Sequence, residues 1–171
     1  MSDPRRAWLQ ILRTPGLGPV RCTRLLEHFG SPERALQASS SERERAGLSR
    51  KLAAALSQEP EGIDSDLAWL DADPNRHLIT RDHPSYPDSL RRIDAPPPAL
   101  FLVGDPDLLA LPQIAIVGSR SASPQGMENA LSFGESLASR GLTITSGMAL
   151  GVDGQAHRGA LRSGGLTIAV F

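Results

Sequence analysis

Apolar residues at helical spacing form stripes along the first part of the chain, residues 1–73. Residues three or four positions apart lie on one face of a helix, so each stripe indicates an amphipathic helix. Ser31-Pro32-Glu33 adds an N-cap, a proline at the first helical position and an acidic first turn. The sequence therefore predicts five short helices and no strand here. The stripes are Trp8, Leu9, Ile11 and Leu12; Val20, Leu25, Leu26 and Phe29; Leu48, Leu52, Ala55 and Leu56; and Ile63, Leu67, Trp69 and Leu70.

The apolar pattern changes after Asp73-Pro74-Asn75, a turn sequence. Short strands are predicted at 77–80 and 100–103, and the proline-rich stretch between them contains a short helix at 87–93. Apolar strands then alternate with helices. Such strands are typical of a parallel sheet buried on both faces, and the βαβαβ order is half of a doubly wound α/β fold. The strands are 113–117, 142–145 and 166–171, and the helices are 124–140 and 153–163.

The predicted architecture is thus a small all-α domain over 1–73, followed by an α/β, Rossmann-like parallel sheet over 76–171. An open sheet that stops at strand 166–171 would leave an unpaired edge, so we expect a fragment of a larger sheet. The composition excludes several structural features. No apolar run approaches the roughly 20 residues of a membrane span, and no apolar signal core follows the N-terminus. Cys22 is the single cysteine, which excludes an internal disulfide, and we expect a cytoplasmic protein.

Charge is unevenly distributed behind the formal net charge of −1. Residues 1–57 carry ten basic and five acidic side chains, whereas 58–110 carry four basic and eleven acidic ones. The basic first third and the acidic middle are therefore different electrostatic units. Arginine provides 17 of the 18 basic residues. Arginine suits bidentate phosphate contacts, although codon usage in a GC-rich genome would give the same excess.

A glycine- and serine-rich loop, 118–126, directly follows the predicted strand 113–117. Gly118 lets the backbone turn sharply, and Ser123-Pro124 starts a helix, so free N–H groups are presented at a helix N-terminus, where anions bind. Ser119 adds a hydroxyl, and Arg120 adds a charge that can bind phosphate at two points. The loop is neither G-x-G-x-x-G nor a P-loop, so neither a nicotinamide cofactor nor a triphosphate is favoured. A tight turn with a solvated Arg120 is the alternative.

A second glycine-rich turn, 146–154, follows the next strand at the same end of the sheet. Right-handed crossovers place both loops along one rim, where Ser146 joins Ser119 and Arg120 in a donor-rich groove. Such a groove suits a row of phosphates better than one small acid. In the helix that follows, capping is the simplest role for Asp153 and packing the simplest for His157, and catalysis is the alternative for both.

Residues 14–21, Thr-Pro-Gly-Leu-Gly-Pro-Val-Arg, resemble the hairpin of helix-hairpin-helix modules. There a Gly-hydrophobic-Gly turn, here Gly16 and Gly18, offers backbone N–H groups to one DNA phosphate without reading the base sequence. A plain interhelical turn is the alternative, because a short connection between helices needs glycine anyway. The arginines that would flank the contact are Arg13, Arg21 and Arg24.

No pattern in the sequence indicates a metal site, a cofactor or a catalytic residue. The glycine loops contain no paired carboxylates, and the chain has no H-E-x-x-H and no His/Asp cluster with metal spacing. Aromatic residues make up 4% of the chain, so stacking of bases on aromatic side chains would be sparse.

Taken together, these motifs resemble the DNA-processing protein A (DprA/Smf) family in order and spacing over residues 76–171. The helical module at 1–73 is similar in position to that family's N-terminal domain. The segments that carry the resemblance are Tyr86-Pro87, Pro96-Pro-Pro-Ala-Leu-Phe-Leu-Val-Gly104, Ile116-Val-Gly-Ser-Arg120, Ser146-Gly-Met-Ala-Leu-Gly-Val-Asp153, Ala156-His157, Gly159-Ala-Leu161 and Gly165-Leu-Thr-Ile-Ala-Val170.

The resemblance implies an extended Rossmann fold that binds single-stranded DNA without sequence preference. It also implies a partner, the RecA recombinase, which the family loads onto incoming strands during natural transformation, and a homodimer for the full-length protein. Carried over by position, Gly118, Ser119 and Arg120 would hold backbone phosphate, and Ser146 and Gly147 would line the same groove.

Two other classes of function stay open. A nucleotide-phosphate-binding hydrolase on a related fold would use Arg120 on a phosphate and Asp153 or His157 in its chemistry. It would also need a general base, and neither glycine loop supplies a glutamate. A pure interaction module would dock a protein on its N-terminal helices. The leading hypothesis is a non-enzymatic DNA-binding protein whose affinity falls steeply with salt as counterions are released.

Overall fold

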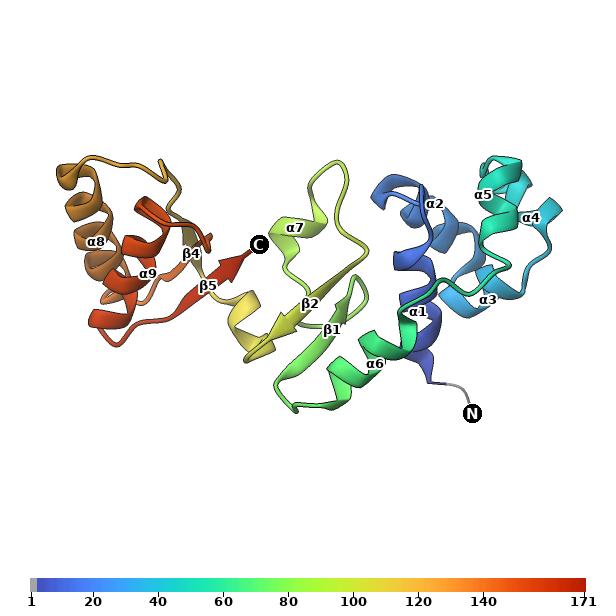
Figure 1. Ribbon diagram of the computed structural model, residues 1–171, viewed down its shortest axis with the longest axis horizontal. Helices are drawn as coiled ribbons and strands as arrows, with labels where there is room; N and C mark the ends of the chain where they lie inside the picture. The colour runs from blue at the N-terminus through green and yellow to red at the C-terminus, as the bar shows by residue number, and fades with distance from the viewer. Residues whose placement is uncertain (1–2) are drawn as a thin grey trace. The chain divides into compact units, whose positions relative to one another are not determined.

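The computed structural model describes residues 3–171, which form two compact units, 3–106 and 107–171 (Figure 1). The elements in chain order are α1 (Pro4–Arg13), α2 (Pro19–Phe29), α3 (Pro32–Gln37), α4 (Ser40–Arg45), α5 (Arg50–Ala55), α6 (Ile63–Asp71), β1 (Arg76–Thr80), α7 (Asp88–Arg91), β2 (Ala99–Val103), the 3-10 helix η1 (Pro106–Ala110), β3 (Gln113–Ala115), α8 (Pro124–Ala138), β4 (Thr143–Gly147), α9 (Val152–Arg162) and β5 (Thr167–Val170).

The helical module at the start of the first unit confirms the five predicted helices and adds one more, α4. Its sequence, Ser-Ser-Glu-Arg-Glu-Arg, has no apolar stripe, so the hydrophobic pattern misses it. The helix begins with a capping box, in which Ser39 accepts from the Glu42 N–H and Glu42 accepts from the Ser39 N–H. Two orphan backbone donors are satisfied in this way, and hydrogen bonds from the Ser39 hydroxyl and the Ser39 N–H lower the pKa of the Glu42 carboxyl.

A core of small and aliphatic side chains holds these helices together. The predicted stripes supply most of it, and the turn between α1 and α2 adds Leu17. The buried cluster consists of Ile11, Leu17, Cys22, Leu25, Ala35, Leu48, Leu52, Ala53 and Leu56. Cys22 lies in this core as predicted, and burial raises the pKa of its thiol to about 11, so it remains a neutral, inert side chain.

The side chain of Arg43 is the exception in this interior, because it is 1% exposed and carries a charge. Its guanidinium donates to the carbonyl oxygens of Ala35 and Ala53, each at 2.9 Å, and to that of Leu36. It also donates to the Ser57 hydroxyl at 2.7 Å. These bonds tie α3, α4 and α5 to one side chain and satisfy carbonyl groups at helix ends, which otherwise lack partners.

The strands β1 and β2 pair antiparallel, with Arg76 opposite Val103, and lie in the first unit beside α6. The connection between them is fixed by Tyr86, which is buried and donates to the Pro97 carbonyl at 2.7 Å. Arg81 donates to the Thr23 hydroxyl on α2 at 2.8 Å and so joins this segment to the helical module. The sequence places the hairpin with the second domain, and that division at residues 73–76 stays a prediction.

The second unit is a parallel sheet of order β3-β4-β5, which confirms the predicted Rossmann-like βαβαβ arrangement. The helices α8 and α9 lie side by side on the same face of the sheet (Figure 1). They approach closely because their contact surface is made of small residues. A side chain at Gly134 would meet the Ala156 carbonyl oxygen at 2.5 Å, and one at Gly159 would meet backbone of α8.

The expectation of strands buried on both faces is correct only in part. Thr143 and Ile144 in β4 are buried, but the three residues of β3 are exposed. Two successive right-handed crossovers in the same direction put both helices on one face, so the described residues of this unit leave the other face uncovered.

Replacing Arg43 by leucine should lower the free energy of unfolding of the first unit by about 3 kcal/mol. About 1 kcal/mol is typical for each hydrogen bond lost, and here the carbonyl partners stay buried. Both tryptophans, Trp8 and Trp69, lie in this unit, so urea denaturation followed by tryptophan fluorescence measures it selectively. Arg45→Leu, an exposed change in the same helix, should alter stability by less than about 0.5 kcal/mol. Equal stabilities for the two variants would contradict the role given to Arg43.

Candidate functional site

The loop after β3 presents a cation and unpaired backbone donors at its surface. Gly118, Ser119 and Arg120 are all exposed. Among residues 3–171, neither the backbone N–H groups of these three residues nor the Arg120 guanidinium has a hydrogen-bond or ion-pair partner. The Ser119 hydroxyl oxygen accepts from the Ser121 N–H at 3.1 Å, which shapes the loop. The arrangement can therefore bind an anion through N–H groups and one arginine.

The loop after β4 lies directly against this loop. The Val152 N–H donates to the Ser119 carbonyl at 3.2 Å. A side chain at Gly118 would meet the Val152 side chain at 2.7 Å, and one at Gly151 would meet the Arg120 carbonyl oxygen at 2.6 Å. Gly151 also has φ +84°, a conformation that other residues rarely adopt. The predicted meeting of the two glycine loops at one rim of the sheet is thus confirmed.

Ser146 connects the two strands below these loops. It is 3% exposed, and its hydroxyl donates to the Ile116 carbonyl at 2.5 Å. This hydrogen bond occupies the single proton of the hydroxyl. The role of Ser146 as a phosphate ligand stays a prediction, and in the structure the residue fixes the position of the strand that leads into the Gly118 loop.

His157 connects α9 to both neighbouring strands. Its Nε2 donates to the Gly147 carbonyl at 2.8 Å, and its Nδ1 shares a hydrogen bond of 2.6 Å with the Thr167 hydroxyl. Both ring nitrogens are therefore engaged, which favours the packed role for His157 over the catalytic one. The sequence did not indicate Thr167 as a partner, because the contact joins residues that only the folded sheet brings together.

Asp153 does not cap α9, which corrects the simplest interpretation of its position. The N-cap is Gly151, and Asp153 is the second residue of the helix. Its carboxylate is 8% exposed and lies against Gly147, where a side chain would meet Oδ2 at 2.6 Å. A carboxylate in the first turn is stabilised by the helix dipole. The same negative charge beside Gly147 weighs against a phosphate there, and the Gly147 contact stays a prediction.

The predicted hairpin turn lies between α1 and α2, and its hydrophobic residue is buried. Leu17 is buried between the exposed Gly16 and Gly18, and Gly16 has φ +86°. Neither glycine N–H has a partner among the described residues, so both can donate to a ligand. Arg21 donates to the Gly16 carbonyl at 3.0 Å and thereby lies across the turn.

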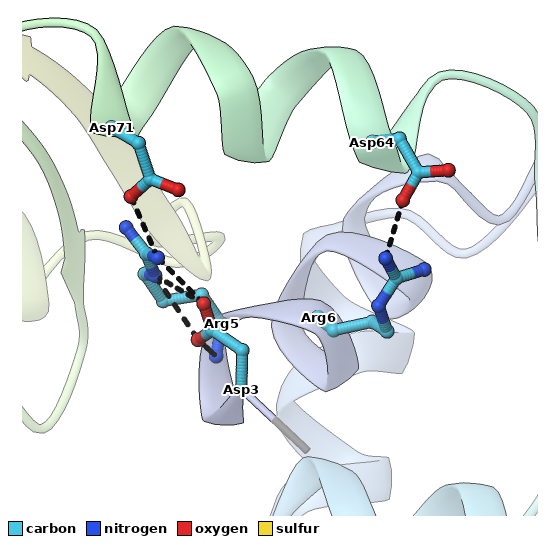
Figure 2. Close-up of polar contacts among 5 residues, drawn as sticks. All are labelled: Asp3, Arg5, Arg6, Asp64 and Asp71. Atoms are coloured by element: carbon cyan, nitrogen blue, oxygen red, sulfur yellow. Dashed lines mark hydrogen bonds and ion pairs between the residues drawn. The ribbon is translucent and has the colours of Figure 1, made fainter.

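Arg13, in contrast, is not available beside this turn. It forms a bidentate pair with Asp66 of α6 and also donates to the Glu61 carbonyl at 3.2 Å. Arg5 and Arg6 are likewise paired with carboxylates of the acidic middle segment (Figure 2). Reading the basic and acidic stretches as separate electrostatic units missed this pairing. Three arginines on one helix, together with an acidic segment long enough to fold back onto that helix, could have indicated the pairing.

Two family models match the chain. "DNA recombination-mediator protein A" matches residues 77–171, and "DprA-like N-terminal HHH domain" matches residues 2–60. The first match covers more than half of the chain. The chain belongs to the DNA recombination-mediator protein A family. The resemblance inferred from the sequence is confirmed.

Individual members of this family support the assignment. "Protein Smf" of Escherichia coli (strain K12) is 46% identical over 65% of this chain and 29% of its own length. "Protein Smf" of Synechocystis is 32% identical over 100% of this chain and 45% of its own length. The X-ray structure of DNA processing protein A (DprA) from Streptococcus pneumoniae superimposes with a TM-score of 0.77 at 28% identity, over 96% of this chain and 56% of that one.

The chain thus spans less than half the length of these two curated family members. Two further features of the described residues concern membranes and metal ions. No helix in the described part of the chain is both long and apolar enough to cross a bilayer. Residues 3–171 also contain no group of three His, Cys, Asp or Glu side chains placed to hold a metal ion.

Replacing Gly151 by alanine should destabilise the second unit, because the new methyl group would push the two glycine loops apart. Gly164→Ala is the matched control, since Gly164 also has positive φ but open space around it. Gly164→Ala should lower the free energy of unfolding by about 1–2 kcal/mol from backbone strain alone. Gly151→Ala should lower it clearly further. Far-UV circular dichroism during heating measures both, with tryptophan fluorescence confirming an intact first unit. Equal costs would show that the loops do not need their close approach.

Proposed function

We propose that this chain binds single-stranded DNA without sequence preference, through phosphate contacts at the loop Gly118–Ser119–Arg120. Ser146 and Gly147 line the same groove at this rim of the sheet, where Ser146 also holds the strand that leads into the loop. Binding serves the processing of incoming DNA, with RecA recombinase as the protein partner and a homodimer as the full-length state. The chain carries out this function by binding and positioning, without catalysis.

The observation that carries the proposal is the set of unpaired donors around Arg120. Residues 118–120 are exposed, their three N–H groups and the Arg120 guanidinium have no partner among the described residues, and the neighbouring glycine loop packs against them. Donors fixed before binding lose little conformational freedom when a phosphate arrives. Such contacts recognise the backbone and not the bases, which fits binding without sequence preference.

The hydrolase alternative receives no comparable support. Both ring nitrogens of His157 are engaged, and the Asp153 carboxylate lies against Gly147 within the first turn of α9. A general base must be able to reach the proton it abstracts. Phosphate capture, in contrast, needs only the exposed groups already in place.

The substitution Arg120→Ala should weaken binding of a labelled single-stranded oligonucleotide about tenfold, which is about 1.4 kcal/mol and typical for a charge-assisted hydrogen bond. The plot of log affinity against log salt should become shallower by about 0.7, the single-strand value for one phosphate contact. Fluorescence anisotropy at several salt concentrations measures both quantities.

Arg140→Ala is the control, because Arg140 is exposed in the same unit and its side chain bonds only to Ser136 of α8, the helix that it follows. It should leave affinity and salt slope unchanged. Duplex DNA and a mononucleotide serve as competitors. Preferential competition by the mononucleotide would instead favour the nucleotide-binding alternative, and equal loss in both arginine variants would contradict the proposed position of the site.

The recombinase contact needs a separate test, because the DNA site and the protein contact need not share residues. Immobilised chain should retain purified RecA in the absence of DNA. Arg120→Ala should retain the same amount, since the substitution affects phosphate binding alone. Failure of the wild-type chain to retain RecA would contradict a recombinase contact within residues 1–171.

A further inference from the structure

We propose that the acidic segment 59–71 is an internal shield whose carboxylates occupy the basic face of α1 in place of DNA phosphates. The inference rests on the proposed function only in taking a phosphodiester backbone as the competing ligand. It assigns to α1 a latent polyanion-binding surface, which the fold covers with its own negative charge.

Arg6, in the first turn of α1, and Arg13, at its last position, show the pairing most clearly. Arg6 donates to Glu59 at 2.6 Å and to Asp64. Arg13, two turns further along, holds Asp66 with both Nε and Nη2, the latter at 2.7 Å. Hydrogen bonding to these carboxylates raises the pKa of both guanidinium groups. Each arginine thus meets carboxylate oxygens in the way it would meet phosphate oxygens.

The start of α1 is covered in the same way. Arg5 lies between Asp3, to which it donates at 2.6 Å, and Asp71 at the end of α6, at 2.9 Å. Figure 2 shows Asp64 and Asp71 extending from α6 toward Arg6 and Arg5. The carboxylates therefore follow α1 along its length.

Gln10 completes the covered face. It lies one turn from Arg6 and one turn from Arg13, and it donates to the carbonyl groups of Leu56 and Gln58 at 3.2 and 3.3 Å. Residues at these spacings share one side of a helix. Arg6, Gln10 and Arg13 are thus all engaged by α6 and the segment that leads into it.

Folding stability alone gives a weak reason for this arrangement. The side chains of Arg5, Arg6 and Arg13 are 33–40% exposed, and that of Asp64 is 86% exposed. Ion pairs this exposed contribute little to stability. α6 is instead held by apolar burial of Ile63 and Leu70, at 1% and 4% exposure. The carboxylates have a larger effect on nucleic-acid binding, because each one cancels a positive charge.

The position of the covered face determines how the shield affects phosphate binding at the neighbouring turn. Arg13 is the last residue of α1, directly before the turn whose Gly16 and Gly18 have free N–H groups. An uncovered α1 would extend that turn into a continuous phosphate-binding surface. With the shield in place, the turn keeps only Arg21 across it and Arg24 one helical turn away.

The test removes the negative charges and keeps the shape of the side chains. The triple variant Glu59→Gln, Asp64→Asn, Asp66→Asn frees Arg6 and Arg13, and the apolar contacts of α6 remain. The control triple Glu44→Gln, Asp82→Asn, Asp94→Asn changes net charge equally at exposed carboxylates of the same unit that form no ion pair among the described residues. Circular dichroism and tryptophan fluorescence establish that both are folded.

Anisotropy with a single-stranded oligonucleotide should show about tenfold tighter binding for the shield variant. Its salt slope should steepen by more than 1, since each freed arginine adds about 0.7. Arg6→Ala with Arg13→Ala in the same background should abolish the gain. An equal gain in the control triple, or no gain in the folded shield variant, would overturn the proposal.

Repeating the measurement with Arg120→Ala separates the two proposals. The shield variant should still gain affinity, because its new contacts lie on α1. If neither wild type nor Arg120→Ala binds DNA but the shield variant does, the Gly118–Arg120 site fails and the shield stands. If wild type binds through Arg120 and the shield variant shows no gain, only the shield fails.

Discussion

The close approach of two glycine loops is the constraint on which the candidate site depends. The Val152 N–H reaches the Ser119 carbonyl only because Gly118 and Gly151 have no side chains to keep the loops apart. That contact uses the first donor of α9 within the protein, whereas the donors of residues 118–120 have no partner among the described residues. Without it, the same residues would form a loose turn with no fixed arrangement of N–H groups. Close packing of the two loop backbones is thus a precondition for ligand binding at this rim of the sheet.

The sequence predicted the second unit well because its signals are local. Apolar strands, the Ser123-Pro124 helix start and glycines at strand ends each specify structure within a few residues. The bounds of β4, α9 and β5 fall within two residues of the predicted ones at nearly every end. What the sequence missed or left open depends on contacts between distant segments. Exposure of β3 follows from which face the helices cover, and the roles of His157 and Ser146 follow from partners on neighbouring strands.

The first unit shows the same division between local and distant information. Apolar stripes revealed five helices, and α4 escaped because a capping box and the buried Arg43 define it instead of a stripe. Arginine at position 43 reads from the sequence as a surface residue. Only the folded module shows that it satisfies carbonyl groups of two helices, α3 and α5, at once. The sequence therefore predicts the roles of charged residues least well. An arginine can be a buried hydrogen-bond donor, half of an ion pair or a free cation.

This distinction changes what the basic first third of the chain means. Its composition suggests a broad affinity for polyanions, yet Arg43 is buried, and Arg5, Arg6 and Arg13 are held by carboxylates. Attraction to DNA depends on charges that can release counterions from phosphates, and a paired or buried arginine releases few. Arg120 carries no such partner among the described residues. One unpaired arginine on a rigid loop can therefore outweigh several in a basic stretch, because availability and not number sets the strength of phosphate binding.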